Sequence, residues 1–150
     1  MRASRLVVVT PAGALLGGCT SAAAGQPATP RDALAISCDE LAGPARGATT
    51  ATLERTFTAA AGETFRVTLC SNPSTGFCWE QPVLSGGAAV EVVDHAVAAP
   101  AGALVGSPGS ETFTFRARAA GTTEIPLAYG QPWAGGIKQA WAVRLTVVAS

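Results

Sequence analysis

The stretch TFRVTLCSNPSTGFCW, residues 64–79, determines the fold that we expect for this sequence. Its first part alternates apolar with polar side chains, which predicts a half-buried β-strand over residues 64–70. Polar residues follow up to Gly76, and a second apolar run begins at Phe77. Since two residues can close a hairpin, a polar loop of this length is either a plain connection or a surface offered to a partner.

From residue 51 onward the sequence repeats this pattern of short apolar runs between turn residues. The last run places Trp141, Val143 and Leu145 on one side of a strand, and its β-branched residues disfavour a helix. We predict one all-β domain, a β-sandwich of about seven strands with no significant helix. The expected strands are residues 51–58, 64–70, 77–83, 88–98, 111–118, 122–129 and 137–150.

The composition excludes some classes of function. The 150 residues carry no net charge and 13% of them are charged, so the sequence lacks the basic surface of a nucleic-acid-binding protein. His95, the single histidine, follows Asp94 on an expected strand, and we expect a surface or partly satisfied residue that nothing pairs with. No G-x-S-x-G motif is present, and no cysteine pair stands near His95 at zinc-ligand spacing. We therefore predict that the protein is not an enzyme and that it has no catalytic residue, no metal site and no cofactor.

The N-terminal residues predict export. Arg2 and Arg5 precede an apolar stretch, residues 6–16, which is too short and too interrupted for a membrane span and fits a signal peptide. The stretch leads into the residues LGGC, which resemble a bacterial lipobox, and we expect their last residue, Cys19, to be lipidated. An ordinary signal peptide cleaved after small residues is the alternative.

These features divide the chain into three parts. Residues 1–18 form the expected lipoprotein signal peptide, and residues 19–35, which are small, polar and proline-containing, form a flexible tether. Residues 36–150 form the expected folded domain. The protein is then exported and held at the cell membrane or cell surface through the lipid on Cys19.

Three further cysteines, Cys38, Cys70 and Cys78, could form disulfides in the oxidising compartment that an exported protein reaches. An odd number leaves one thiol over, unless it pairs with another chain. A bridge between Cys70 and Cys78 would close the base of the polar loop, whereas a bridge from Cys38 to Cys70 would tie the N-terminal segment to a strand. The spacing leaves both pairings open.

Two more loops share the polar, glycine-rich character of the first, at residues 106–109 and 130–133. The three loops follow the second, fourth and sixth expected strands. In an antiparallel sandwich such connections fall at the same end, so we expect all three loops to lie together. Trp133 is either an exposed anchor for a partner or a plug that folds back over the sandwich.

Together, the three loops resemble those of the chagasin-type inhibitors of papain-like cysteine peptidases. That family carries an N-P-T-T-G loop, a G-x-G-G-type loop and an R-P-W/F loop in this order on an immunoglobulin-like sandwich. The segments NPSTG, GSPG and QPW match these motifs, and Phe77 and Trp79 follow the first as in relatives. The resemblance covers approximately residues 50–148 and implies the immunoglobulin-like fold.

The resemblance implies a monomeric, reversible, non-covalent inhibitor whose loops occlude the cleft of a papain-like cysteine peptidase. Thr75 would lie near the catalytic centre of the peptidase, and Trp133 would pack against an aromatic surface beside it. The alternative is a cell-envelope lipoprotein binding module that uses the same loops for a different protein partner. The implied peptidase-binding residues are Asn72, Pro73, Ser74, Thr75, Gly76, Phe77, Gly106, Ser107, Pro108, Gly109, Gln131, Pro132 and Trp133.

The sequence departs from the family pattern in its second and third loops and shares a pair of cysteines with bacterial relatives. Gln131 stands where arginine is usual, which implies weaker or differently selective inhibition, and Pro108 departs from the glycine-rich pattern of the second loop. Bacterial relatives often pair a cysteine of an early CDE segment with the one in LCSN. This implies a bridge from Cys38 to Cys70, with Cys78 unassigned or an alternative partner.

Overall fold

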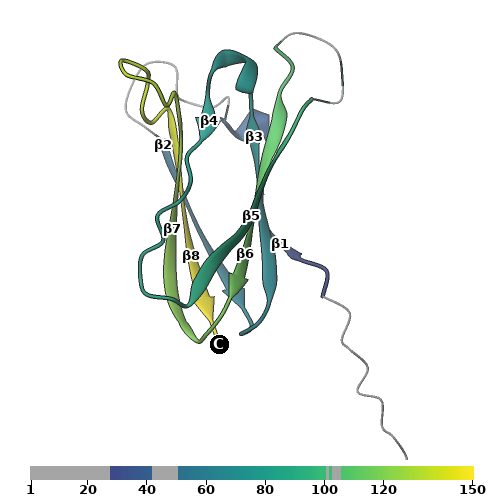
Figure 1. The fold of residues 1–150 in the computed structure, drawn as a ribbon, viewed down its shortest axis with the longest axis vertical. Coiled ribbons are helices and arrows are strands. Elements are labelled where there is room, and N and C mark those ends of the chain that lie inside the picture. The colour runs from purple at the N-terminus through teal and green to yellow at the C-terminus, as the bar shows by residue number, and fades with distance from the viewer. Residues whose placement is uncertain (1–27, 42–50, 101, 103–105) are drawn as a thin grey trace, which may run out of the picture.

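The structure, a computed structural model, describes residues 28–41, 51–100, 102 and 106–150. Within these ranges the chain forms eight strands, one short α-helix and one 3₁₀ turn (Figure 1). They are β1 (Arg31–Ile36), α1 (Cys38–Leu41), β2 (Ala51–Ala59), β3 (Thr64–Ser71), η1 (Pro73–Thr75), β4 (Cys78–Trp79), β5 (Val90–Ala98), β6 (Gly109–Ala117), β7 (Gly121–Gly130) and β8 (Trp141–Ala149). The expected Cys19 lipidation site lies outside the described residues.

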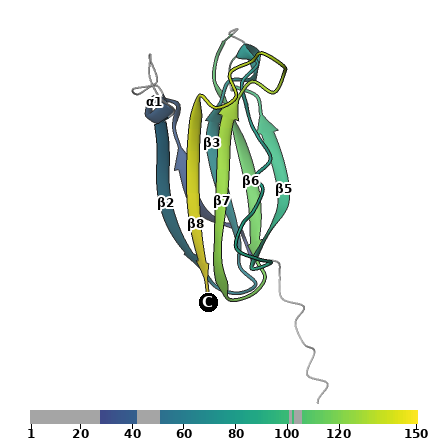
Figure 2. The ribbon, with the colours of Figure 1, turned by 90° about the vertical axis from the view of Figure 1, so that its left-hand side faces the viewer.

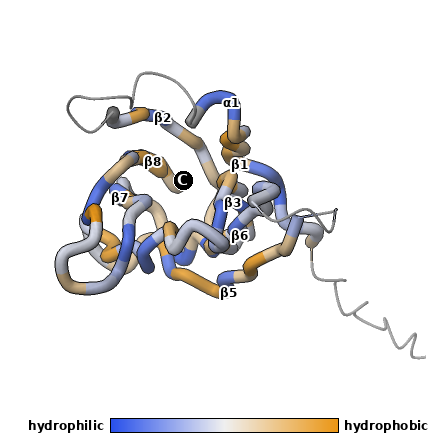
Figure 3. Tube along the Cα trace, turned by 90° about the horizontal axis from the view of Figure 1, so that it is seen from above, coloured by the Kyte–Doolittle hydropathy of each residue, from blue (hydrophilic) through white to orange (hydrophobic). Residues whose placement is uncertain are grey.

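The strands form two four-stranded sheets that pack face to face, as Figure 3 shows from above. One sheet has the order β1-β3-β6-β5 and the other the order β2-β8-β7-β4. Pairing is antiparallel except between β1 and β3 and between β2 and β8, which run parallel. The predicted all-β, immunoglobulin-like sandwich is thus confirmed.

The core lies between the sheets and follows the period-two alternation of the strands. On β3, Phe65, Val67 and Leu69 are buried, and β6 buries Phe113 and Phe115 opposite them in the register. The rings of Phe65 and Phe115 stack with centroids 5.4 Å apart. Burying these large apolar side chains gives most of the free energy that holds the two sheets together. The other sheet contributes the remaining large core residues, Ile125, Leu127, Val143, Leu145 and Val147.

The N-terminal strand corrects one expected boundary. β1 begins at Arg31, inside the segment expected to be a flexible tether, residues 19–35. It pairs in parallel with β3, and Arg31 forms an ion pair with Glu63 at 2.6 Å. The sequence RDALAI alternates too weakly to predict a strand. These residues form a strand because they pair with β3.

Two other expected strands differ from the observed ones. The run 77–83 forms only the two-residue strand β4, since Pro82 cannot donate to a sheet ladder. The run 137–150 becomes a strand only at Trp141, because the residues before it belong to a loop. The other observed strands begin or end within about two residues of the expected bounds.

A disulfide and a helix cap fix the segment that follows β1. Cys38 is bonded to Cys70 on β3, which confirms the pairing that the family resemblance implies. The Ser37 amide donates to Glu40 Oε2 at 2.8 Å, a capping interaction at the start of α1. This hydrogen bond holds the pKa of the Glu40 carboxyl below its ordinary value. In the described part of the chain, no helix has the length and apolar character needed to cross a bilayer.

We expect the disulfide to make a large contribution to stability. The two cysteines are 32 residues apart, and closing a loop of this length in the unfolded chain corresponds to about 3–4 kcal/mol in the chain-entropy model. The double substitution Cys38→Ser, Cys70→Ser should lower the free energy of unfolding by that amount in a urea titration. Cys78→Ser, which removes the unpaired thiol, is the matched control and should change it by less than about 1 kcal/mol. Equal losses in the two proteins would contradict this account.

Candidate functional site

Three loops gather at one end of the sandwich, at the top of Figures 1 and 2. We call them loop 1 (residues 72–77), loop 2 (the described residues 99, 100, 102 and 106–108) and loop 3 (residues 131–140). The strand register brings them together, because Ser71 pairs with Gly109 and Cys78 pairs with Gly130. Loop 1 therefore begins beside the end of loop 2 and ends beside the start of loop 3, as the strand count predicts.

Loop 1 is a compact turn with its own hydrogen bonds. The Thr75 amide donates to Asn72 O at 3.1 Å, and the Gly76 amide donates to Pro73 O at 2.9 Å. The Thr75 hydroxyl also donates to Asn72 O, at 2.7 Å, and the Ser74 hydroxyl donates to Asn72 Oδ1 at 2.6 Å. Gly76 ends the 3₁₀ turn at φ 78°, a left-handed conformation that favours glycine. The loop is thus held in one shape by five of its own residues.

Loops 1 and 2 are joined directly. The Asn72 side chain donates from Nδ2 to Gly106 O at 3.0 Å. Beside this contact lies a shallow hollow of about 450 Å³ with mainly apolar walls. Pro73 and Ser74 form one side of the hollow, and Val97 on β5 is 59% exposed at another. Figure 3 shows hydrophobic stretches along β5 at the edge of its sheet.

Loops 1 and 3 meet through Trp133. Its side chain is about half exposed, and its ring lies against Gly76, where a Cβ atom would overlap Cη2 and Cζ3 of the indole. Trp133 is therefore neither a buried plug nor a free side chain, because its six-membered ring lies against loop 1 while about half of the residue stays exposed. Pro132 beside it is exposed.

Loop 3 is closed by a side chain that the resemblance places in the binding surface. Gln131 Oε1 accepts a hydrogen bond from the Ile137 amide at 3.1 Å, and the Gln131 amide donates to Ile137 O at 2.6 Å. Lys138 Nζ donates to Trp133 O at 2.5 Å. An arginine side chain has no acceptor for the Ile137 amide, so in this chain Gln131 has a structural role inside the loop.

Not every expected site residue lies at the tips of the loops. Gly109 is the first residue of β6, where it pairs with Ser71, and a Cβ atom there would overlap Ala98 O. Its requirement for glycine is therefore explained by strand packing. Ser107 is partly buried, whereas Pro108 and Gly106 are exposed. The structure thus brings the thirteen expected residues to one end. Some of them are exposed on the loops, and others, such as Gly109, pack inside the fold and support the loops.

An aromatic group supports loop 1 from below, and the sequence did not single out its central member, Tyr129. The Asn72 amide donates to the Tyr129 hydroxyl at 2.8 Å. The Tyr129 ring lies 5.4 Å from the ring of Phe77 and 5.0 Å from that of Trp79. Burial of this phenol raises its pKa above the ordinary value, so it remains a neutral hydrogen-bonding group at physiological pH.

A buried contact between His95 and Glu111 is the second group that sequence reasoning missed. The expectation that nothing pairs with His95 is wrong, because His95 Nε2 lies 2.9 Å from Glu111 Oε2. The imidazole stacks on Phe113 with centroids 4.1 Å apart. The alternation of β6 gives a signal for this site, since Glu111 falls on the same face as Phe113 and Phe115.

The unpaired thiol of Cys78 is not a reactive group in this setting. Its pKa lies above the ordinary value, first because of burial and then because of the carboxylates of Glu111 and Glu80. A thiol with a raised pKa is a poor nucleophile at neutral pH. Among the residues that the structure describes, no cluster of three or more His, Cys, Asp or Glu side chains is placed to hold a metal ion.

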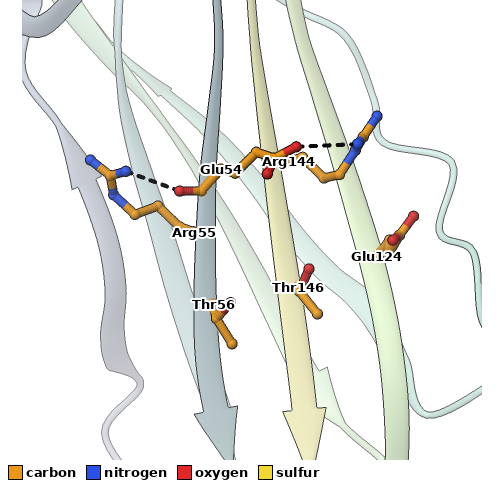
Figure 4. A pocket seen from close by; sticks show the side chains of 6 residues that line it. All are labelled: Glu54, Arg55, Thr56, Glu124, Arg144 and Thr146. Carbon is orange, nitrogen blue, oxygen red and sulfur yellow. Dashed lines mark hydrogen bonds and ion pairs between the residues drawn. The ribbon is translucent and has the colours of Figure 1, made fainter.

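A polar depression on the outer face of β2, β8 and β7 lies away from the loops (Figure 4). Arg144 Nη1 lies 3.3 Å from Glu54 Oε1, and Arg55 Nη1 donates to Glu54 O at 3.0 Å. The exposed charges of Arg144 and Glu54 pair with each other, and such surface pairs contribute little to stability or binding. The depression is the solvated side of a sheet, and the loop end is the stronger candidate site.

The comparison with protein families agrees with this geometry. The family model described as chagasin family peptidase inhibitor I42 matches residues 58–147, which include all three loops. The chain belongs to this family. Chagasin from Trypanosoma cruzi is 37% identical to the inhibitor over 87 residues, which cover 53% of this chain and 76% of chagasin. As a family member the chain is a peptidase inhibitor and not an enzyme.

Solved structures of low sequence identity share the fold of the inhibitor. The cysteine protease inhibitor EhICP2 from Entamoeba histolytica superposes with a TM-score of 0.56 at 21% identity, covering 81% of this chain and 100% of EhICP2. PbICP-C, solved in complex with falcipain-2, superposes with a TM-score of 0.51 at 15% identity, covering 80% of this chain and 99% of PbICP-C. Both likenesses support the sandwich architecture.

The contact between Gly76 and Trp133 can be tested with a matched pair of glycines. Gly76 and Gly135 both have positive φ, but only a Cβ atom at Gly76 would meet the Trp133 ring. We expect Gly135→Ala to lower the free energy of unfolding by about 1–2 kcal/mol through backbone strain alone. Gly76→Ala should lower it further and make tryptophan fluorescence more accessible to acrylamide. Identical quenching in the two variants would show that the indole does not rest on loop 1.

Proposed function

We propose that this inhibitor blocks papain-like cysteine peptidases by placing loops 1, 2 and 3 in the active-site cleft, reversibly and without a covalent bond. One observation carries the proposal: at one end of the sandwich, loop 1 contacts both loop 2 and loop 3, although the three loops are distant in sequence. Asn72 joins loop 1 to loop 2, and Trp133 of loop 3 lies on Gly76 of loop 1. The three loops thus form one continuous surface.

The shape of loop 1 supports inhibition rather than cleavage. Its amides at Thr75 and Gly76 are used within the 3₁₀ turn, and Gly76 has a left-handed conformation. This backbone is not an extended segment of the kind that peptide-binding grooves hold through main-chain hydrogen bonds. Loop 1 enters the cleft as a bulky turn, so its peptide bonds are not held in the extended form in which a substrate is cleaved.

The internal bonds of the loops also favour affinity. A loop that is already ordered loses little conformational entropy when it binds, so a larger share of the contact energy appears as affinity. Trp133 offers a half-exposed indole that lies against Gly76, which is typical of an interface anchor. Pro73 and Pro132 restrict the backbone on the two sides of the surface.

The relatives support the class of partner. EhICP2 is a cysteine protease inhibitor, and PbICP-C was solved in complex with falcipain-2. We propose the same class of partner for this chain, a papain-like cysteine peptidase, on the strength of the three loop motifs. The thirteen residues of the expected binding surface stay a prediction until a complex or a set of variants tests them.

We further propose that the inhibitor is a lipoprotein anchored through Cys19. The proposal rests on the apolar N-terminal stretch and the LGGC segment alone. Since β1 begins at Arg31, the chain between Cys19 and the sandwich comprises residues 20–30. Fully extended, these residues reach about 40 Å at most. Metabolic labelling with a radioactive fatty acid, lost in Cys19→Ala, would support the anchor, and undiminished labelling would exclude it.

Inhibition is tested by titrating papain with the full-length chain and its Trp133→Ala variant. We expect the wild-type chain to inhibit reversibly, and Trp133→Ala to raise the inhibition constant by about 30-fold or more, as for other interface anchors. Val148→Ala, which truncates a partly exposed side chain near the other end of the sandwich, should leave the constant unchanged. A folded wild-type chain that fails to inhibit papain at micromolar concentration would exclude the proposal and favour a binding module with another partner.

A further inference from the structure

The two strands that flank loop 1 belong to different sheets. β3 ends at Ser71 in the sheet β1-β3-β6-β5, and β4 begins at Cys78 in the sheet β2-β8-β7-β4. A hairpin loop is held at its base by the ladder between its own two strands, but β3 and β4 share no ladder. Side chains therefore have to connect the two ends of loop 1.

The carboxylate of Glu111 makes this connection. Glu111 lies on β6 and is 1% exposed. Its Oε1 atom accepts a hydrogen bond from the Ser71 hydroxyl at 2.6 Å and another from the Trp79 amide at 3.2 Å. Ser71 directly precedes loop 1, and Trp79 is the second residue after it. One oxygen atom thus holds both ends of the loop and links the two sheets.

The other oxygen of the carboxylate has a partner on β5. His95 Nε2 lies 2.9 Å from Glu111 Oε2, and Gln81 Nε2 lies 2.9 Å from His95 Nδ1. The side chain of His95 is 23% exposed, so this contact lies between the buried carboxylate and the surface. The other titratable groups close to the carboxylate are the Cys78 thiol on β4 and the Tyr129 phenol on β7, both neutral near pH 7.

A buried carboxylate is costly for the fold alone. Removing an ionised group from water carries a large penalty, and an ion pair recovers only part of it. The neighbouring inward positions on β6, Phe113 and Phe115, are apolar and contribute to the core in the ordinary way. The bonds of Glu111 are directed at the base of loop 1, which is where a fixed loop shape matters for binding.

We propose that Glu111 is a positioning residue for peptidase inhibition, which holds loop 1 in its binding shape and has His95 as its hydrogen-bonding partner. The proposal rests on the proposed function, because it assigns the affinity of loop 1 partly to a residue outside the three loops. Glu111 itself lies below the surface and does not touch the peptidase.

The first test compares Glu111→Ala with Glu111→Gln in the full-length chain, using papain as the probe. The alanine variant leaves the Ser71 hydroxyl and the Trp79 amide without an acceptor, and we expect its inhibition constant to rise about tenfold. The glutamine variant keeps an acceptor oxygen and should recover most of this loss. Glu124→Gln, the same change at an exposed carboxylate on the outer face of β7, is the control and should behave as wild type. A folded alanine variant with the wild-type constant would overturn the proposal.

The second test removes the contact between His95 and Glu111. We expect His95→Phe, which keeps an aromatic ring against Phe113 but has no hydrogen-bonding nitrogen, to raise the inhibition constant for papain about threefold. His95→Gln, which keeps a polar group at this position, is the control and should lie closer to wild type. A folded His95→Phe variant with the wild-type constant would exclude His95 as the partner of Glu111.

A third measurement separates the positioning role from the proposed function, because it needs no peptidase. Hydrogen exchange of the Thr75 and Gly76 amides, which are bonded inside loop 1, should be about tenfold faster in Glu111→Ala than in wild type. Exchange that accelerates equally across β3 and β6 would indicate general destabilisation and overturn the positioning role. If wild type fails to inhibit papain but loop 1 alone loses protection, the proposed function fails and the positioning of loop 1 stands.

Discussion

The packing of two sheets across a core of phenylalanine, valine and leucine side chains is the constraint on which the rest of this molecule depends. Phe65 and Phe115 stack at the centre of that core, and their strands pair in a register that ends at Ser71 and Gly109. The loops begin where this register ends. Their positions are therefore set by the apolar faces of strands that never contact a partner, so the sandwich acts as a rigid mount for irregular segments.

Polar contacts, rather than the apolar core, fix the shape of loop 1. Loop 1 crosses from one sheet to the other, and its ends are joined through Glu111, the Tyr129 hydroxyl and the Trp79 indole, whose Nε1 donates to Cys70 O at 2.9 Å. Each of these bonds is directional, unlike apolar packing, and so it can specify the shape of a loop as well as its location. The disulfide adds a covalent link on the same strand, at Cys70.

The sequence predicts the parts of the structure that follow a local period. The alternation in β3 and β6, with large apolar side chains at every second residue, suffices to assign both strands and their buried faces. β1 escaped prediction because RDALAI depends on its partner β3, and β8 begins later than expected because Ile137 is bonded to Gln131. Loop composition identified the candidate site. The pairing of His95 with Glu111 brings together residues of two strands, and the sequence signals only one of them, through the inward position of Glu111 on β6.

The parallel pairing of β1 with β3 has a consequence for attachment. β3 runs toward loop 1, so β1 starts at the opposite end of the sandwich, where the Arg31 guanidinium contacts Thr58 O. The C-terminal residue Ser150 lies at that end as well, bonded to Ala59 and Ala61 (Figure 1). The start of β1 and Ser150 thus both lie on the side away from the loops. A surface, a carrier protein or a solid support joined to the chain at either of these points would leave the three loops facing outward, free to meet a peptidase from the surrounding medium.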